Sequence, residues 1–191
     1  MSTLLPLSPL RRNHPTISHW CPLGLSVFFI TLSLLLASCS RPEKKIIPNE
    51  EVWSFLLKRA AEHQLDPGFV YSIAFAESSF NAYADSGVAR GITQMTKDAW
   101  TTVTDISYDR AWNWRTNLDT AMLYLVHCRE RLTAAKHFNY PLLAASYRYG
   151  PGAVQKANYR IAALPKPTNK IYQQIFAGHI HPYPPPNSDD N

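Results

Sequence analysis

The sequence predicts a mainly α-helical domain, and three observations support that class. Apolar residues recur at spacings of three and four along most of the chain after residue 50, which is the period of a helix with one buried face. Residues that start and end helices, such as Asp66-Pro67 and Gly150, bound several of these stretches. No stretch alternates steadily between polar and apolar residues, so strands should be few.

The helices are expected in a definite order. Residues 50–64 contain no Gly or Pro, and their apolar residues share one face. Asp66 as N-cap and Pro67 at the first helical position then start a second helix that continues to residue 79. This second helix is apolar on nearly every side, so we expect it to be central and buried. After a polar loop, further helices are expected over residues 95–103, 118–133, 141–149, 153–163 and 169–177.

The composition is that of one folded domain with a mild basic excess. Of the 191 residues, 46% are apolar and 12% are aromatic, which excludes a disordered chain. The net charge is +5, but Arg11 and Arg12 lie in a predicted leader, and the remainder has 17 Lys and Arg against 14 Asp and Glu. A mild excess fits an acidic polymer. Without a basic run or zinc-ligand spacing, we expect no nucleic acid, no metal ion and no cofactor.

The first part of the chain has the form of a targeting signal. Residues 23–37 are apolar, a length that suits a secretory signal better than a membrane span of about 20 residues. The following Leu36-Ala37-Ser38-Cys39 resembles the bacterial lipobox, in which the chain is cut before the cysteine and its sulfur receives diacylglycerol. We therefore expect a signal peptide over 1–38 and a lipidated tether over 39–49; an uncleaved signal anchor is the alternative. By the same resemblance, Ser40 after the cysteine implies the outer membrane of a two-membrane bacterium, with the protein on the periplasmic face.

Glu77 is the first candidate for chemistry. It follows Val70, Ile73 and Ala74 on one face of the predicted central helix, so it continues a buried apolar stripe. Burial and the negative end of the helix both favour the neutral acid and raise its pKa. A carboxyl group that stays protonated near neutral pH is suited to protonate a glycosidic oxygen. A buried glutamate satisfied by its neighbours is the alternative.

Several motifs from Glu77 onward resemble those of one enzyme family. Glu77-Ser78 and the Ala-Arg-Gly-Ile-Thr-Gln-Met segment of 89–95 resemble the Glu-Ser and Gly-Leu-Met-Gln motifs of the soluble-lytic-transglycosylase (SLT) family. That family shares its fold with goose-type lysozyme. Residues 117–125, 145–154 and 167–172 resemble its later Asn-Ile…Tyr-Leu, Ala-Tyr-Asn-Ala-Gly-Pro-Gly and Pro-Glu-Thr-Arg-x-Tyr motifs. The resemblance implies a lysozyme-like helical domain over 50–180. The four prolines and polar end of the remaining residues predict a disordered, proline-rich tail over 181–191.

The resemblance also implies the residues of the site. Glu77 would be the catalytic acid and base, and the predicted substrate-binding residues are Ser86, Gly91, Gln94, Tyr147 and Arg148. Gly91 would let the backbone approach the sugar, Gln94 offers one acceptor and two donors, and Tyr147 offers a flat face and a hydroxyl. The alternatives are that Gly91 forms a plain turn, that Gln94 caps a helix and that Tyr147 fills the core. Arg148 stands where the family has asparagine, and it either contacts a substrate carboxylate or is a solvated helix charge.

The implied reaction needs only one carboxylate. A retaining hydrolase uses two carboxyls about 5 Å apart. Here no second carboxylate stands at the family's spacing. Asp85 is near Glu77 in the sequence, but the sequence does not place its loop relative to Glu77. The family's route is therefore expected. Glu77 protonates the oxygen between N-acetylmuramic acid and N-acetylglucosamine, and then takes the proton of the sugar's own 6-hydroxyl to leave a 1,6-anhydro ring. The alternatives are a water-using muramidase on the same fold and an inactive peptidoglycan-binding lipoprotein.

Overall fold

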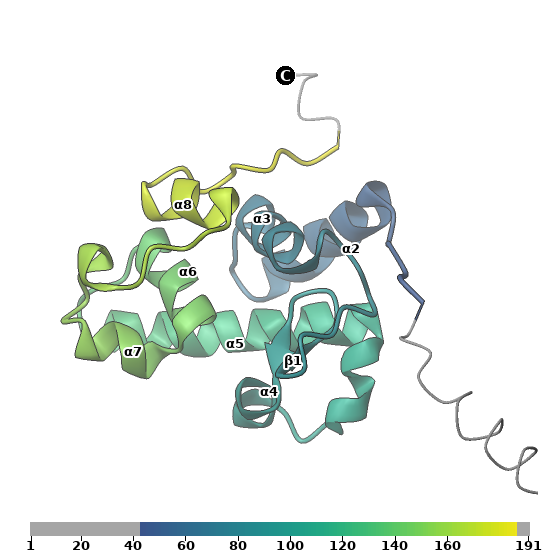
Figure 1. Ribbon diagram of the computed structural model, residues 1–191, viewed down its shortest axis with the longest axis horizontal. Coiled ribbons are helices and arrows are strands. Elements are labelled where there is room, and N and C mark those ends of the chain that lie inside the picture. The colour runs from purple at the N-terminus through teal and green to yellow at the C-terminus, as the bar shows by residue number, and fades with distance from the viewer. Residues whose placement is uncertain (1–42, 187–191) are drawn as a thin grey trace, which may run out of the picture. The chain divides into compact units, whose positions relative to one another are not determined.

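The computed structural model describes residues 43–186, which are mainly helical (Figure 1). The elements in order are α2 (Asn49–Glu62), α3 (Pro67–Ser78), β1 (Ala89–Arg90), β2 (Met95–Thr96), α4 (Lys97–Val103), the 3-10 helix η1 (Tyr108–Trp112), α5 (Trp114–Ala134), α6 (Tyr140–Tyr149), α7 (Pro151–Lys156), the 3-10 turn η2 (Ile161–Ala163) and α8 (Lys170–Phe176). The two short strands pair antiparallel, with Ala89 opposite Thr96. The predicted helical class is confirmed. The predicted leader, Cys39 and the start of the tether lie outside the described residues.

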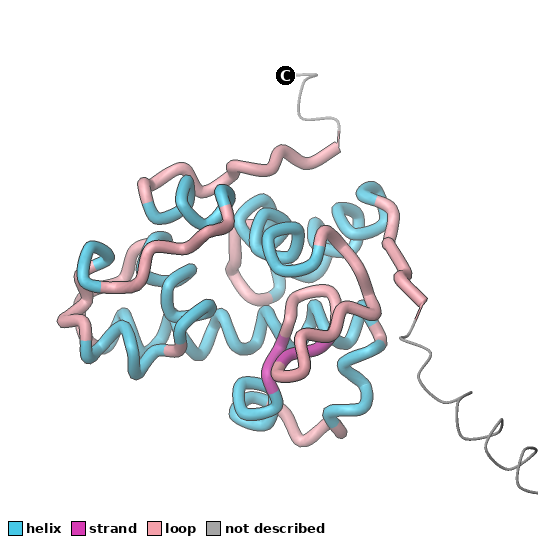
Figure 2. The backbone as a smooth tube through the Cα atoms, in the orientation of Figure 1, coloured by secondary structure: helices cyan, strands magenta, loops and turns pink. Residues whose placement is uncertain are grey.

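Helix α3 is the central helix, as predicted. Asp66 caps it by accepting a hydrogen bond from the Phe69 amide at 2.8 Å, and Pro67 takes the first turn. Every residue from Gly68 to Ala74 is buried, because α2 and α8 pack against α3 while the long α5 also contacts α2 (Figure 2). The apolar character on all sides of α3 is explained by this enclosure.

The backbone reverses immediately after α3. Ser79 and Phe80 adopt left-handed conformations, with φ of +52° and +61°. The Ser78 hydroxyl donates to the Ile92 carbonyl at 2.6 Å, which joins the end of α3 to the β1–β2 loop. The last turn of α3 is therefore held against the loop that follows it.

Several helix boundaries differ from those predicted. The helix expected from residue 95 begins at Lys97, because Met95 and Thr96 pair with β1 and the Thr96 side chain caps α4. Helix α5 begins four residues before the expected start, because Asn113 accepts a hydrogen bond from the Thr116 amide. The helix expected over 153–163 is instead the short α7, which starts at Pro151, followed by η2. In each case a capping side chain or a proline decided the boundary.

The prediction of a disordered tail over 181–191 is wrong for its first residues. The Tyr183 ring stacks on Phe75 of α3 with centroids 3.5 Å apart, and its hydroxyl accepts a hydrogen bond from Asn49 at 3.2 Å. His181 Nε2 lies 2.7 Å from Asp66 Oδ1. An aromatic ring in a proline-rich segment has an apolar face to bury, and α3 supplies the aromatic surface that receives it. Residues 187–191 lie outside the described part.

Within residues 43–186, no helix combines the length and the apolar character that crossing a bilayer requires. The apolar side chains instead form one core around α3, α5 and α6.

Candidate active site

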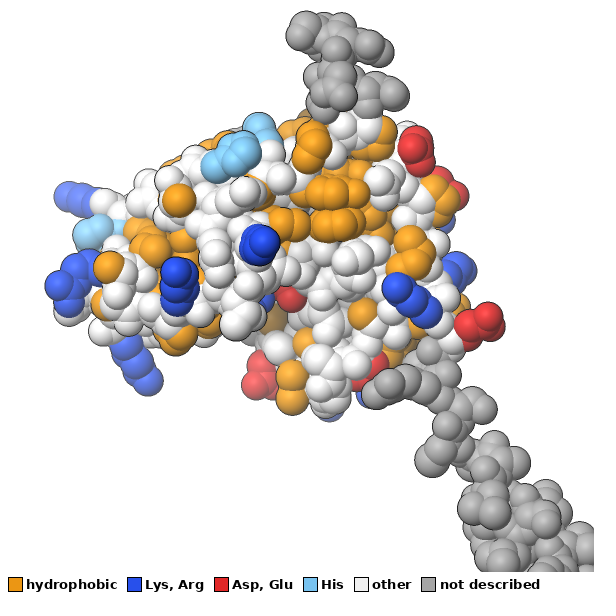
Figure 3. Space-filling view, turned by 45° about the horizontal axis from the view of Figure 1, so that its top comes forward, with side chains coloured by type: hydrophobic (Ala, Val, Ile, Leu, Met, Phe, Trp, Pro, Cys, Tyr) orange, Lys and Arg blue, Asp and Glu red, His pale blue; other side chains and the backbone are white. Residues whose placement is uncertain are grey.

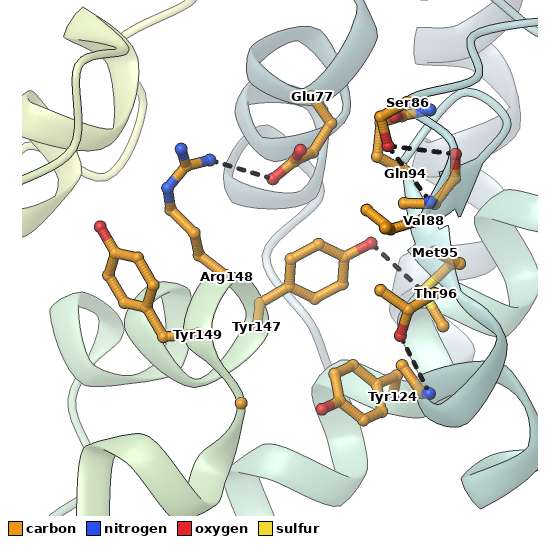
Figure 4. Close-up of a pocket in the computed structure, with 13 residues that line it drawn as sticks. Glu77, Ser86, Val88, Gln94, Met95, Thr96, Tyr124, Tyr147, Arg148 and Tyr149 are labelled. Atoms are coloured by element: carbon orange, nitrogen blue, oxygen red, sulfur yellow. Dashed lines mark hydrogen bonds and ion pairs between the residues drawn. The ribbon is translucent and has the colours of Figure 1, made fainter. Parts of the chain in front are cut away.

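A cleft of about 550 Å³ lies beside the C-terminal end of α3 (Figure 4). One wall comes from the β1–β2 region and the start of α4, and the other comes from the end of α6, with Tyr124 of α5 also contributing. The lining residues are Glu77, Ser86, Val88, Ala89, Gln94, Met95, Thr96, Ala99, Tyr124, Tyr147, Arg148, Tyr149 and Gly150. Of the predicted site residues, all except Gly91 therefore line this cleft.

Glu77 lies on the last turn of α3, and its side chain is 14% exposed. Burial raises the pKa of this carboxyl above its ordinary value, and two neighbours oppose that rise. The Tyr172 hydroxyl donates a hydrogen bond to Oε1, and the Arg148 guanidinium attracts the charged form. Burial has the largest effect, so the net shift makes the carboxyl group easier to keep protonated than an ordinary glutamate.

Tyr172 of α8 is the functional candidate that the sequence reasoning missed. Its side chain is fully buried, and its hydroxyl lies 2.5 Å from Glu77 Oε1. Burial, reinforced by the nearby carboxylate, raises the pKa of this phenol well above its ordinary value, so the hydroxyl remains a donor. The signal for it in the sequence is the motif at residues 167–172, which ends on this tyrosine.

Arg148 of α6 faces Glu77 across the cleft (Figure 4). Its Nη1 lies 3.7 Å from Glu77 Oε1, and its guanidinium rests on the Tyr172 ring with 4.6 Å to the centroid. Arg148 is thus not the freely solvated helix charge that one alternative proposed. In this state its partner is the protein's own carboxylate.

Tyr147 forms part of the cleft wall, but its hydroxyl bonds the opposite wall and not Glu77. The hydroxyl donates to the Thr93 carbonyl at 2.8 Å and lies 3.3 Å from the Met95 sulfur (Figure 4). Burial raises the pKa of this phenol well above its ordinary value. The hydroxyl therefore connects α6 to the opposite wall, and the ring remains as the surface that faces the cleft.

Gln94 and Ser86 hold the shape of the other wall. The Gln94 side-chain amide donates to the carbonyls of Ala84 and Gly91 at 2.9 and 3.0 Å, so its donors are used within the loop and Oε1 remains for a ligand. Ser86 Oγ accepts from the Ala89 amide at 3.1 Å. Between them Val88 is 76% exposed at the edge of the cleft.

Gly91 has a different role from the one predicted. It is buried and is not among the residues that line the cleft, so the geometry supports a packing role and not the predicted close approach to the sugar. Its φ is +81°, and a Cβ there would lie 2.3 Å from both the Ala111 carbonyl and Asn117 Nδ2. Asn117 is fully buried and bonds the backbone of Thr93, Arg90 and Ala111. Gly91 is thus needed because it leaves room for the asparagine that positions the loop.

Glu77 is the single carboxylate among the residues that line the cleft within 43–186. Asp85, whose position the sequence did not settle, is exposed outside the lining and accepts a hydrogen bond from the Gly87 amide at 2.8 Å. In the described part of the chain, no group of three or more His, Cys, Asp or Glu side chains is placed to hold a metal ion. The cleft therefore offers one acid, one guanidinium and several hydroxyl and amide groups.

Comparison with known proteins adds two findings. Residues 54–168 match the protein family described as the transglycosylase SLT domain. A solved structure, an inactive mutant of lytic transglycosylase Slt from Pseudomonas aeruginosa, is similar to the chain at 20% identity with a TM-score of 0.46. The similarity covers 64% of this chain and 20% of that chain, so the match spans about a fifth of the longer protein. No curated protein sequence matches the chain.

Proposed function

Because the chain belongs to the transglycosylase SLT family, we propose that it is a peptidoglycan lytic transglycosylase with Glu77 as its single acid and base. The bond cleaved is the β-1,4 bond from N-acetylmuramic acid to N-acetylglucosamine. The observation that carries this proposal is that Glu77 is the one carboxylate lining the cleft within residues 43–186. A retaining hydrolase of the usual kind would place a second carboxylate about 5 Å away.

The proposed reaction uses the same carboxyl group twice. Protonated Glu77 donates its proton to the glycosidic oxygen, and the bond from that oxygen to the muramic acid C1 breaks. The carboxylate that remains takes the proton of the 6-hydroxyl of the same sugar, whose oxygen bonds to C1. Glu77 is thereby protonated again, no water is consumed, and the product ends in a 1,6-anhydro ring.

The environment of Glu77 suits both steps. Burial favours the protonated acid before cleavage. The Tyr172 hydroxyl stabilises the carboxylate that forms after the proton has left. The remaining predicted residues would hold the sugars: Ser86 and Gln94 through polar groups, and Tyr147 through its ring.

We also propose that the enzyme acts at the periplasmic face of a membrane. The support is the lipobox-like Leu36-Ala37-Ser38-Cys39 and the polar residues that separate it from the domain. A lipid on Cys39 would anchor the domain without a spanning helix, and Ser40 favours the outer membrane. This placement brings the cleft near the peptidoglycan layer.

The test is the mass of the products released from purified sacculi. The wild type should release muropeptides with 1,6-anhydro ends, lighter by one water than the products of a muramidase. Glu77→Gln should release almost none yet still bind sacculi, because the loss of general acid or base catalysis typically costs about 10² to 10⁴ in rate. Asp85→Asn is the matched control, since it removes a carboxylate outside the cleft and should leave the products unchanged.

Each other result has a definite meaning. Reducing ends in place of anhydro ends would identify a hydrolytic muramidase. Binding without any products from the wild type would identify an inactive binding lipoprotein. Full activity of Glu77→Gln would remove the basis of the proposed mechanism.

A further inference from the structure

The Arg148 side chain lies in the cleft with donors that the protein does not fully use. Its Nη1 is 3.7 Å from Glu77 Oε1, which is an ion pair but too long for a hydrogen bond. Its Nε is buried and has no hydrogen-bond partner among residues 43–186. The guanidinium is supported by the rings of Tyr172 and Tyr149, at 4.6 and 5.7 Å. These contacts hold a planar cation at the cleft wall without satisfying all of its N–H groups.

The pairing of Arg148 with Glu77 opposes the first step of the proposed reaction. A cation beside a carboxyl group favours the ionised form, whereas protonation of the glycosidic oxygen requires the neutral acid. Arg148 accordingly lowers the pKa of Glu77 against the effect of burial. If the Arg148 guanidinium moved to another anion when the glycan binds, it would no longer favour the ionised form of Glu77. Glu77 would then keep its proton for the first step.

The part of the molecule around the α6 wall, the lobe of residues 127–181, is positively charged, and this charge indicates which chemical groups it attracts. Residues 127–181, which include the end of α5 and all of α6, α7 and α8, contain a single acidic residue, Glu130. Their cationic residues are Arg129, Arg131, Lys136, Arg148, Lys156, Arg160, Lys166 and Lys170. Lys and Arg side chains also gather at this end of the molecule in the face shown by Figure 3. The α6 wall of the cleft therefore belongs to a lobe that attracts negative charge.

We propose that Arg148 selects glycans that carry a carboxylate near the scissile bond, because its guanidinium leaves Glu77 to bind that carboxylate. The inference rests on the proposed function, and it adds a substrate requirement that the single-acid mechanism does not contain. In peptidoglycan the carboxylate belongs to the stem peptide or, on strands whose peptide has been removed, to the lactyl ether of muramic acid, whose carboxyl otherwise forms the amide bond to the peptide. Both are carboxylates that a guanidinium binds with paired hydrogen bonds.

The test uses sacculi with and without their carboxylates. Intact sacculi and sacculi stripped of peptides by an amidase are each compared with a portion whose carboxyl groups have been converted to amides. The wild type should lose about tenfold or more in kcat/KM on at least one amidated substrate, the size expected for a lost hydrogen bond between charged groups. Loss on the stripped strands assigns the carboxylate to the lactyl group, and loss on intact sacculi alone assigns it to the stem peptide.

Arg148→Asn should lose this discrimination while still forming anhydro ends. Lys156→Asn is the matched control, because it removes an exposed cation of the same lobe outside the cleft and should discriminate as the wild type does. Equal activity of the wild type on charged and amidated strands would overturn the inference, as would wild-type discrimination by Arg148→Asn. Anhydro products in either case would leave the proposed function standing, whereas their absence from wild-type digests would contradict the function itself.

Discussion

The Tyr172 hydroxyl donates a hydrogen bond to Glu77 Oε1 at 2.5 Å, although the two residues are 95 positions apart in the chain. Asn169, which caps α8, also donates to the Ala76 carbonyl at 2.9 Å. The start of α8 is therefore fastened to the last turn of α3, next to the acid. The last helix of the domain thus helps to set the protonation of a residue on its central helix.

Tyr172→Phe should shift the pH dependence of the reaction. The hydrogen bond from Tyr172 lowers the pKa of Glu77, so its removal should raise that pKa and move the limb for Glu77 deprotonation to higher pH. We expect kcat to fall about tenfold, since a hydrogen bond to the developing carboxylate is lost. Tyr108→Phe is the control, because that hydroxyl bonds the Met95 carbonyl instead. An unmoved limb in Tyr172→Phe would contradict the assignment.

Glu77→Gln should be more stable than the wild type at neutral pH. The pKa of Glu77 is raised in the folded state, so between the unfolded and folded pKa values the folded protein holds more protons. Its stability therefore falls as pH rises through this window. The variant has no proton to lose at this position, so its stability does not fall in this window. The difference in unfolding free energy between the variant and the wild type should therefore grow with pH by at most about 1.4 kcal/mol per pH unit and then become constant. Denaturant unfolding across the pH range measures it, and a difference independent of pH would contradict the raised pKa.

Gly91→Ala should destabilise the fold rather than affect activity alone. A Cβ would lie 2.3 Å from Asn117 Nδ2 and from the Ala111 carbonyl, at a φ of +81°. We expect a loss of about 2 kcal/mol or more, from overpacking and backbone strain together. Gly152→Ala is the control, since nothing lies within 4 Å of its Cβ position. Thermal unfolding followed by circular dichroism compares the two, and an unchanged midpoint for Gly91→Ala would contradict the packing role assigned to this glycine.

Cys39 should carry fatty acid when the protein is made in a bacterial host. The prediction follows from the lipobox-like sequence and concerns a residue outside the described part of the chain. Growth with labelled palmitate should label the wild type and Cys21→Ala, but not Cys39→Ala. Label on all three proteins, or on none, would show that the lipoprotein prediction is wrong.

The helical class and the position of the acid followed from local patterns in the sequence. Asp66 and Pro67 start α3 because capping and a fixed φ act within one turn. Glu77 lies at the end of its apolar stripe because helical spacing places it there. The motifs also led to Gln94, Tyr147 and Arg148, which all line the cleft. Each of these inferences depends on residues close together in the chain or on the order of short motifs.

The sequence by itself indicated the helical class, the family and the position of Glu77, whereas only the tertiary structure decided what the buried polar groups contact. It brought Tyr172 to Glu77, turned the Tyr147 hydroxyl toward Thr93, placed Asn117 against Gly91 and ordered Tyr183 on Phe75. The physical reason is that a hydrogen bond or ring contact depends on distance and direction to within a few tenths of an ångström. Helical period and motif order specify which face a residue occupies, and the packing of α3, α6 and α8 specifies which atom it meets there.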